Sequence, residues 1–190
     1  MGFGLGLWLW KTLDEPRRLL VAFLGLSGML GVLEAGLRIA GQKNAWVGAF
    51  WELAIVSTLF SALVLRCGQP TRNVAKLIQL LALCTWCAYF LYSGQFGAFS
   101  GGFHAALCIV GVGLAALVII NQQARPEDLW LGWVTMALMA IDILPNAASC
   151  DWLGSKESAR ALWCARNGLW CVGYAAFAYS LSVANRGNKC

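Results

Sequence analysis

Six long apolar runs divide this sequence, and they limit what the chain can fold into. They cover residues 19–37, 46–65, 77–92, 103–120, 129–144 and 161–184. A helix that crosses the hydrocarbon core of a bilayer needs about 20 mainly apolar residues. We therefore predict an all-α, polytopic membrane bundle of six transmembrane helices. Because the third and fifth runs are the shortest, five helices is the alternative.

The composition argues against a water-soluble fold. Of the 190 residues, 59% are hydrophobic and only 12% are charged, and the mean hydropathy is +0.66. A soluble chain this short has too little interior to hide that much apolar surface, whereas lipid can cover it. We expect an interfacial amino-terminal segment (1–18), a single membrane domain (19–184) and a short polar tail (185–190).

The basic residues between the runs predict the orientation of the helices. With six spans, nine lysines and arginines fall on one side and four on the other. Cytosolic loops are enriched in these residues, so both termini are expected in the cytosol. The same distribution accounts for the formal charge of +5 through topology and anionic lipid headgroups, without a nucleic-acid partner. The nine are Lys11, Arg17, Arg18, Arg66, Arg72, Lys76, Arg125, Arg186 and Lys189; the four are Arg38, Lys43, Lys156 and Arg160.

Charged residues inside the runs are the strongest functional candidates, because a charge is costly to bury in lipid. Glu34 and Arg38 lie four apart on one predicted helix and can pair there. Glu52, Asp142 and Arg166 fall at a similar depth, towards the outer face. One hypothesis is a polar cluster in which Asp142 and Arg166 pair across adjacent helices. The alternative is that each side chain reaches separately to the headgroups.

Four cysteines have the spacing or position of redox or disulfide pairs. Cys84 and Cys87 form a Cys-X-X-Cys motif, and Cys150 with Cys164 could be a second pair. The first pair lies in an apolar run, where buried cysteines usually behave as small hydrophobic residues. A structural bridge between Cys150 and Cys164 would need an oxidising compartment.

His104 is the only histidine, and it precedes the fourth predicted helix. With no partner at metal-ligand spacing, we expect it to form hydrogen bonds at the membrane interface and not to bind a metal. The sequence contains no recognisable Ser/His/Asp set or glycine-rich phosphate loop. We therefore predict no catalytic residues, no cofactor and no metal.

Small residues and a weak internal repeat suggest how the helices pack. Residues spaced four apart, such as Gly111 and Ala115, let membrane helices approach closely, within one bundle or between copies. Trp86-Cys87 recurs 84 residues later as Trp170-Cys171. Three helices per half would make the halves inverted, as in many transporters.

Four short elements resemble the peroxin-11 family of peroxisomal membrane-elongation proteins. They are residues 11–19, 63–68 and 92–97, and Asp142 followed by Gly168 and Gly173. The amino-terminal half departs from that family because it is almost wholly apolar. The resemblance implies membrane remodelling through helix insertion and self-association, without catalysis.

The function predicted first is non-enzymatic: a multi-pass protein of an organellar membrane, such as the peroxisomal one, or of a bacterial inner membrane. It would act on the lipid bilayer through packing, self-association or membrane shaping, or as one of the subunits of a larger complex. The alternative is a small transporter or channel, and the third is a thiol-disulfide oxidoreductase. A polar cavity joining Glu52, Asp142 and Arg166 would favour transport, whereas a solid bundle would favour the structural role.

Overall fold

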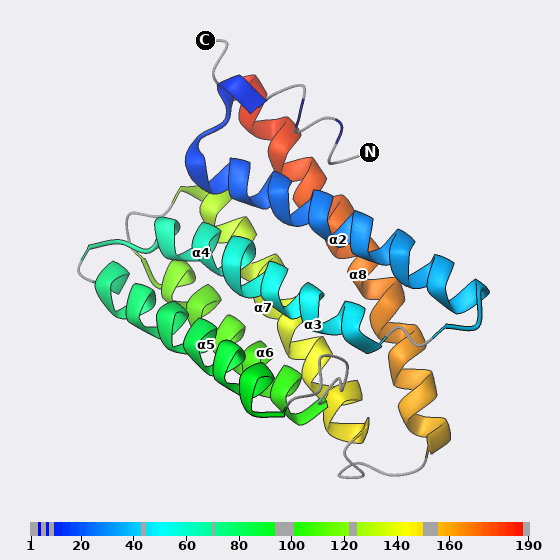
Figure 1. Ribbon diagram of the computed structural model, residues 1–190. Coiled ribbons are helices and arrows are strands. Elements are labelled where there is room, and N and C mark those ends of the chain that lie inside the picture. Colours follow the sequence, from blue (N-terminus) through cyan, green and yellow to red (C-terminus); the bar gives the residue numbers. More distant parts are fainter. Residues whose placement is uncertain are drawn as a thin grey trace.

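The protein is a bundle of long helices (Figure 1). The computed structural model describes residues 10–42, 45–69, 71–93, 101–121, 125–149 and 156–187, with Gly4 and Leu7 as isolated residues. All regular structure in these ranges is helical. The elements are η1 (Trp10–Thr12), α2 (Glu15–Ile39), α3 (Ala45–Ala54), η2 (Ile55–Leu59), α4 (Phe60–Arg66), α5 (Thr71–Ser93), α6 (Gly101–Ile119), α7 (Pro126–Ser149) and α8 (Lys156–Gly187).

Five helical segments are long and apolar enough to cross a membrane, which confirms the predicted all-α architecture built from helices of membrane-spanning length. They are Glu15–Ile39, Trp46–Arg66, Thr71–Leu91, Gly102–Ile119 and Asp128–Asn146. The sixth predicted span corresponds to α8, which has 32 residues and is long enough. Its hydropathy is lower because Arg166 and Asn167 interrupt the apolar run. The bundle therefore has five to six helices of membrane-spanning length and composition.

Local sequence signals explain where α2 begins and why α7 is longer than expected. The side chain of Asp14 accepts a hydrogen bond from the Arg17 amide at 3.3 Å and so caps α2. Pro145 directly follows the fifth apolar run and predicts that the helix ends there, but this prediction is wrong, because α7 continues to Ser149. In a bundle, neighbouring groups can compensate for the one backbone hydrogen bond that a proline removes. Helix α8 extends to Gly187, into the predicted polar tail.

The second span contains a widened, π-helical turn, η2. Such turns leave carbonyl groups without their usual amide partners. The Thr58 hydroxyl donates to the Ala54 carbonyl at 2.5 Å, and the Gln79 side chain of α5 donates to the Val56 carbonyl at 2.9 Å. Side chains thus satisfy the irregular backbone within the bundle, as a lipid environment requires.

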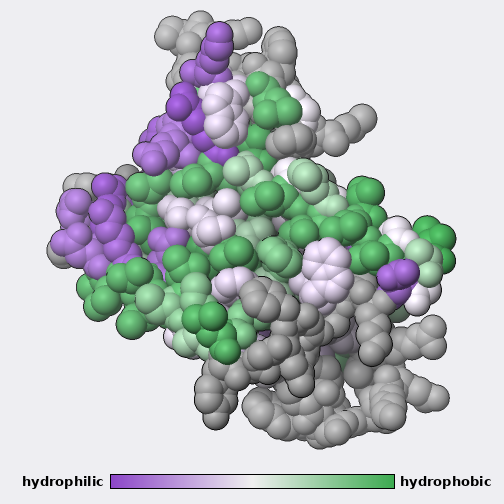
Figure 2. Space-filling model, viewed as in Figure 1, coloured by the Kyte–Doolittle hydropathy of each residue, from purple (hydrophilic) through white to green (hydrophobic). Residues whose placement is uncertain are grey.

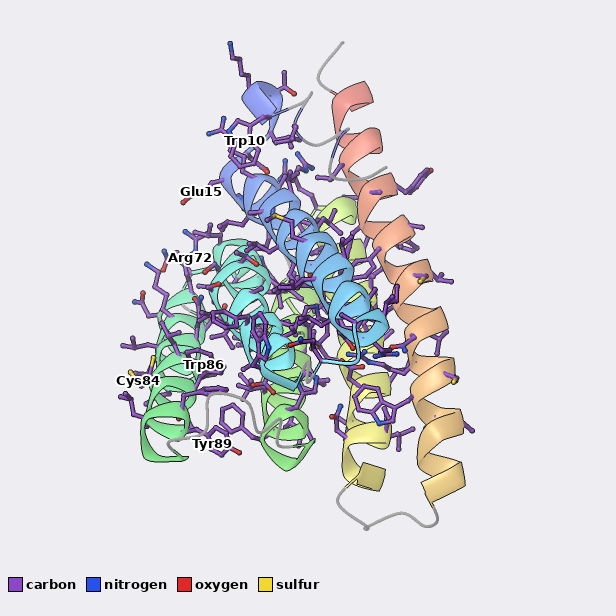
Figure 3. The ribbon with its side chains drawn as sticks, turned by 45° about the vertical axis from the view of Figure 1, so that its right-hand side comes forward. Trp10, Glu15, Arg72, Cys84, Trp86 and Tyr89 are labelled. Atoms are coloured by element: carbon purple, nitrogen blue, oxygen red, sulfur yellow. The ribbon has the colours of Figure 1, made fainter. Side chains whose placement is uncertain are left out.

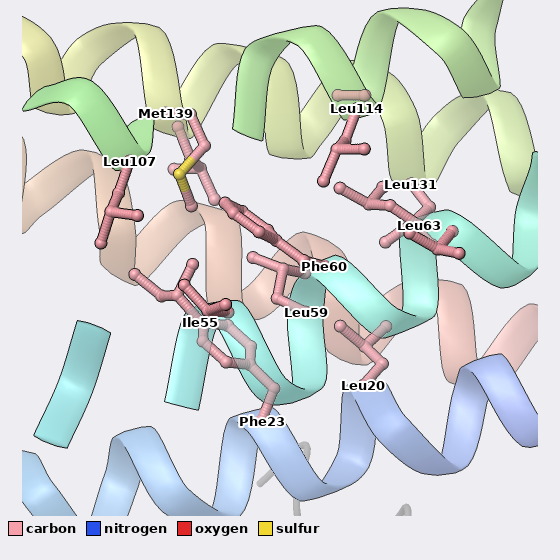
Figure 4. Packing of buried hydrophobic residues seen from close by; sticks show 14 of the residues in the cluster. Leu20, Phe23, Ile55, Leu59, Phe60, Leu63, Leu107, Leu114, Leu131 and Met139 are labelled. Carbon is pink, nitrogen blue, oxygen red and sulfur yellow. The ribbon is translucent and has the colours of Figure 1, made fainter. Parts of the chain in front are cut away.

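A hydrophobic core joins the second span to α2, α6 and α7. Phe60 and Leu59 lie between Phe23 of α2 and Met139 of α7 (Figure 4), and all four side chains are fully buried. Trp86 and Trp170 are also buried. Many other leucines and valines are exposed on the helix surfaces, which is expected of helices that face lipid.

Charged residues form a network at one end of the bundle. Arg66, at the end of α4, contacts Asp14 at 2.6 Å and Asp128 of α7 at 2.9 Å. Arg125 also reaches Asp14, at 3.4 Å. Burial raises the pKa of Asp14, but the cations Arg66 and Arg17 outweigh it, so this pKa lies below its usual value. The network requires α2 and α7 to begin, and α4 to end, at the same end of the bundle.

The polar surface agrees with this arrangement of the helix ends. Hydrophilic residues gather near the beginning of α2 and where α4 leads into α5, and the surface beyond them is mostly hydrophobic (Figure 2). The end of α8 lies at the same end of the bundle as the beginning of α2 (Figure 1). The six long segments therefore alternate in direction along the bundle.

A substitution at Gly132 tests the close contact between α6 and α7. A Cβ atom there would lie 2.9 Å from Ile119 Cγ1 and 3.2 Å from the backbone oxygen of Ala115. We expect Gly132→Ala to lower the free energy of unfolding by about 1–3 kcal/mol, because backbone has to move. The matched control is Gly113→Ala on exposed α6 surface, where no atom lies within 4 Å. Equal stability of the two variants in detergent unfolding would contradict the packing described.

Candidate site in a buried polar cluster

Polar side chains from four helices meet in the part of the bundle away from the charged network. They are Glu52 of α3, His104 of α6, Asp142 of α7, and Arg166 and Trp170 of α8, and we call them the polar cluster. The exposed fractions of Glu52, His104 and Asp142 are 2%, 1% and 0%. Charged groups this deeply buried require partners, so each contact in the cluster matters to stability.

His104 lies between two carboxylates. Its Nδ1 is 3.2 Å from Oε1 of Glu52, and its Nε2 is 3.3 Å from Oδ2 of Asp142. The ring also stacks on Trp51, with centroids 5.6 Å apart. The prediction of an interfacial histidine is therefore wrong: residues distant in the sequence enclose it. A neutral imidazole donates from one nitrogen only, so donation to both carboxylates would make the ring cationic.

Asp142 contacts three other members of the polar cluster, His104, Arg166 and Trp170. Arg166 donates from Nε to Oδ1 at 2.5 Å and from Nη2 to Oδ2 at 3.1 Å. Trp170 Nε1 donates to Oδ1 at 2.8 Å. The pairing of Asp142 with Arg166 across adjacent helices, expected from the sequence, is present. Paired hydrogen bonds of this kind are among the strongest between side chains.

Aromatic rings surround the Arg166 guanidinium. Its central carbon lies 5.0 Å from the ring centroids of both Trp51 and Trp163, and 5.7 Å from that of Trp170. Tryptophan faces attract cations, most strongly when water is excluded. Arg166 is therefore held by one carboxylate and three rings, in a fixed orientation.

A cavity of about 790 Å³ adjoins the polar cluster. His104, Arg166, Trp51 and Trp170 line it, together with residues of α2, α3 and α8. Glu34 and Arg38 also border it and form the expected i,i+4 pair at 2.6 Å, with both side chains exposed. Glu52 and Asp142 are not in its lining, and they touch the cavity only through His104 and Arg166.

The cysteines have different surroundings from one another. Cys84 and Cys87 carry free thiols on exposed surface of α5, and Cys84 lies on its outer side (Figure 3). Cys164 is exposed on α8 and borders the cavity. Cys150 lies outside the described residues, so its bridge to Cys164 stays a prediction.

Cys108 is a site residue that the sequence reasoning missed. It lies on α6 one turn after His104, and both side chains are buried. One potential metal-ligand atom from each of His104, Cys108 and Asp142 falls within 4.8 Å of the others. The i,i+4 spacing of histidine and cysteine was a signal for a shared helix face. The position of Asp142 on another helix could not be read from that spacing.

No family model matches this chain, and no curated protein or solved structure does either.

The hydrogen bond from Trp170 to Asp142 can be tested separately from aromatic packing. Trp170→Phe removes the indole donor but keeps an aromatic ring. We expect it to lower the free energy of unfolding by about 1.5–3 kcal/mol, the contribution of a hydrogen bond to a charged group. The control is Trp133→Phe on exposed α7 surface, which should change stability little. Equal effects in detergent unfolding would show that the donor is unimportant.

Proposed function

We propose that this protein is a small membrane transporter that takes a polar solute into the cavity beside the polar cluster. In this proposal six helices span the bilayer, with both termini in the cytosol, and the cavity faces the opposite side. The predicted inverted repeat is not required. The observation that carries the proposal is the 790 Å³ cavity reaching His104, which is buried, and Arg166, which is partly buried.

Buried charges in membrane helices support this proposal. They are costly unless they face a cavity or pair with one another, and they commonly belong to solute or ion pathways. His104 and Arg166 do both, since each lines the cavity and contacts a carboxylate. Packing alone does not require charged residues at these positions, because replacing a buried ion pair by well-packed apolar residues is often neutral or stabilising.

Aromatic residues of α2 and α8 pack against Tyr174, which lines the cavity. Phe23 of α2 lies 6.3 Å from Tyr174 and 6.4 Å from Phe177 of α8, measured between ring centroids. Phe23 and Phe177 are fully buried, and Tyr174 lines the cavity. We call Phe23, Tyr174 and Phe177 the aromatic seal. In the proposed transport cycle these rings block the path from the cavity to the cytosolic end, and alternating access requires them to separate after the solute has bound.

The structural role and the peroxin-11 resemblance stay predictions. Both concern self-association and membrane shaping, which depend on surfaces that face lipid or other copies. The cavity is an additional feature that neither accounts for. We therefore favour transport over membrane shaping.

Thiol labelling tests whether the cavity contains water. Variants with one remaining cysteine would keep either Cys164, beside the cavity, or Cys84, on the outer side of α5. In membrane vesicles of known orientation, a charged, membrane-impermeant thiol reagent should modify Cys164 from the non-cytosolic side only. Cys84 should not react, because lipid surrounds it. Equal labelling of both cysteines, or of neither, would contradict the proposal.

A leak assay tests the aromatic seal itself. Phe23→Ala should connect the cavity to the cytosolic end and let protons or small ions leak from proteoliposomes that contain a pH indicator. Phe90→Ala is the control, because Phe90 is a buried aromatic residue of α5 that is not part of the aromatic seal. A leak in both variants would reflect general loosening of the bundle and would count against the seal.

A further inference from the structure

We infer that His104, Cys108 and Asp142 form a binding site for a divalent transition-metal ion of the zinc type. The inference deepens the proposed function, because it makes this ion the solute that enters the cavity. The site itself rests on geometry and would exist whether or not transport occurs.

The three side chains offer a suitable donor set. Imidazole nitrogen, thiolate sulfur and carboxylate oxygen are the three ligand types that Zn²⁺ takes in proteins. His104 and Cys108 project from the same face of α6, one turn apart, and Asp142 approaches from α7. Hard cations such as Mg²⁺ prefer oxygen ligands, so nitrogen and sulfur together favour a transition metal.

The distances suit a tetrahedral ion. With bonds of about 2.0–2.3 Å from zinc to nitrogen, oxygen or sulfur, neighbouring ligand atoms lie about 3.3–3.6 Å apart. His104 Nε2 and Asp142 Oδ2 are 3.3 Å apart, and the three potential ligand atoms fall within 4.8 Å of one another. A small movement of the Cys108 side chain would complete the three-ligand arrangement.

The surroundings of the ligands are those of a metal site. Metal-bound histidines usually donate their other ring N–H to a carboxylate, which fixes the orientation of the ring. Glu52 lies 3.2 Å from Nδ1 of His104 and is placed to accept such a hydrogen bond. Arg166 and Trp170 similarly orient Asp142. Each of these partners is a positioning residue and not itself a ligand.

The site has a route for entry and a free coordination position. Exchangeable zinc sites typically have three protein ligands and an open fourth position. Because His104 lines the cavity, an ion bound to it can exchange water or transient ligands there. Glu34, Cys164 and Cys171 also border the cavity, so their oxygen and sulfur atoms are available as transient ligands for an entering ion.

An anionic solute is the competing possibility, and the contacts of Arg166 argue against it. Nε and Nη2 of Arg166 donate to Asp142, and Nη1 donates to Asn167. The guanidinium charge is therefore already balanced by a carboxylate. An incoming anion would have to displace Asp142 to gain comparable hydrogen bonds.

Cobalt(II) binding to the purified full-length protein in detergent tests the site. Co²⁺ follows zinc in its ligand preferences and reports a bound thiolate through a sulfur-to-metal charge-transfer band. We expect one bound ion, visible absorption typical of tetrahedral Co²⁺, and displacement of Co²⁺ by Zn²⁺. Cys108→Ser should abolish the charge-transfer band, whereas Cys84→Ser should retain it. A protein that binds no Co²⁺, or a band that survives in Cys108→Ser, would overturn the inference.

A second variant separates a positioning role from general damage to the fold. Glu52→Gln leaves all three ligands in place and should weaken Co²⁺ binding about 10–100-fold, as loss of a partner to a metal-bound histidine does. Its visible spectrum at saturating Co²⁺ should match that of the unaltered protein, since coordination is unchanged. Unaltered affinity in Glu52→Gln would contradict the assigned geometry.

Zinc uptake into proteoliposomes with an entrapped zinc-sensitive dye links the site to transport. Uptake should occur with the unaltered protein and fail with Cys108→Ser. If Co²⁺ does not bind but Cys164 is labelled from one side only, the metal inference is wrong and the transporter proposal stands. If Co²⁺ binds but Cys164 is not labelled and zinc does not enter, the metal site stands and the transporter proposal is wrong.

Discussion

The buried carboxylate of Asp142 is the feature on which the arrangement of the carboxy-terminal helices depends. A negative charge at zero exposure needs positive and hydrogen-bonding partners. Arg166 and Trp170 of α8 and His104 of α6 supply them. Three helices are therefore held by one side chain, and Glu52 of α3 joins them through the histidine.

The two polar ends of the bundle together account for the cavity. Arg166 binds α8 to α7 through Asp142, whereas Asp14 binds the beginning of α2 to Arg66 of α4. Helices α2 and α8 are therefore paired with different neighbouring helices. They contact each other through the aromatic seal around Phe23. Beyond that seal they separate, and residues from both helices border the cavity. A cavity lined by polar residues in so apolar a chain follows from this division of partners.

Features encoded locally were predictable from the sequence. The helix start at Asp14, the Glu34–Arg38 pair and most helix positions follow from capping, i,i+4 spacing and apolar run length. The Asp142–Arg166 pair was one of two arrangements that the sequence allowed, because opposite charges at a similar depth in adjacent helices can pair.

Features that depend on several helices were not predictable. The sequence gives no indication that His104 has Glu52 on one side and Asp142 on the other, since that requires the rotation of α3, α6 and α7 about their axes. Cys108 was overlooked for the same reason. Pro145 misled because a proline disfavours a helix interior but does not forbid it, and whether neighbouring groups compensate depends on the tertiary structure.

The most direct test of this account is a double-mutant cycle on Asp142 and Arg166, measured by reversible unfolding in detergent. Asp142→Asn and Arg166→Met should each cost about 3–5 kcal/mol, because each leaves a buried charge without its partner. The double variant should lose several kcal/mol less than the sum of the two single losses. The exposed Glu34–Arg38 pair, treated with Glu34→Gln and Arg38→Met, should couple by less than about 1 kcal/mol. Additive losses at Asp142 and Arg166 would contradict the account.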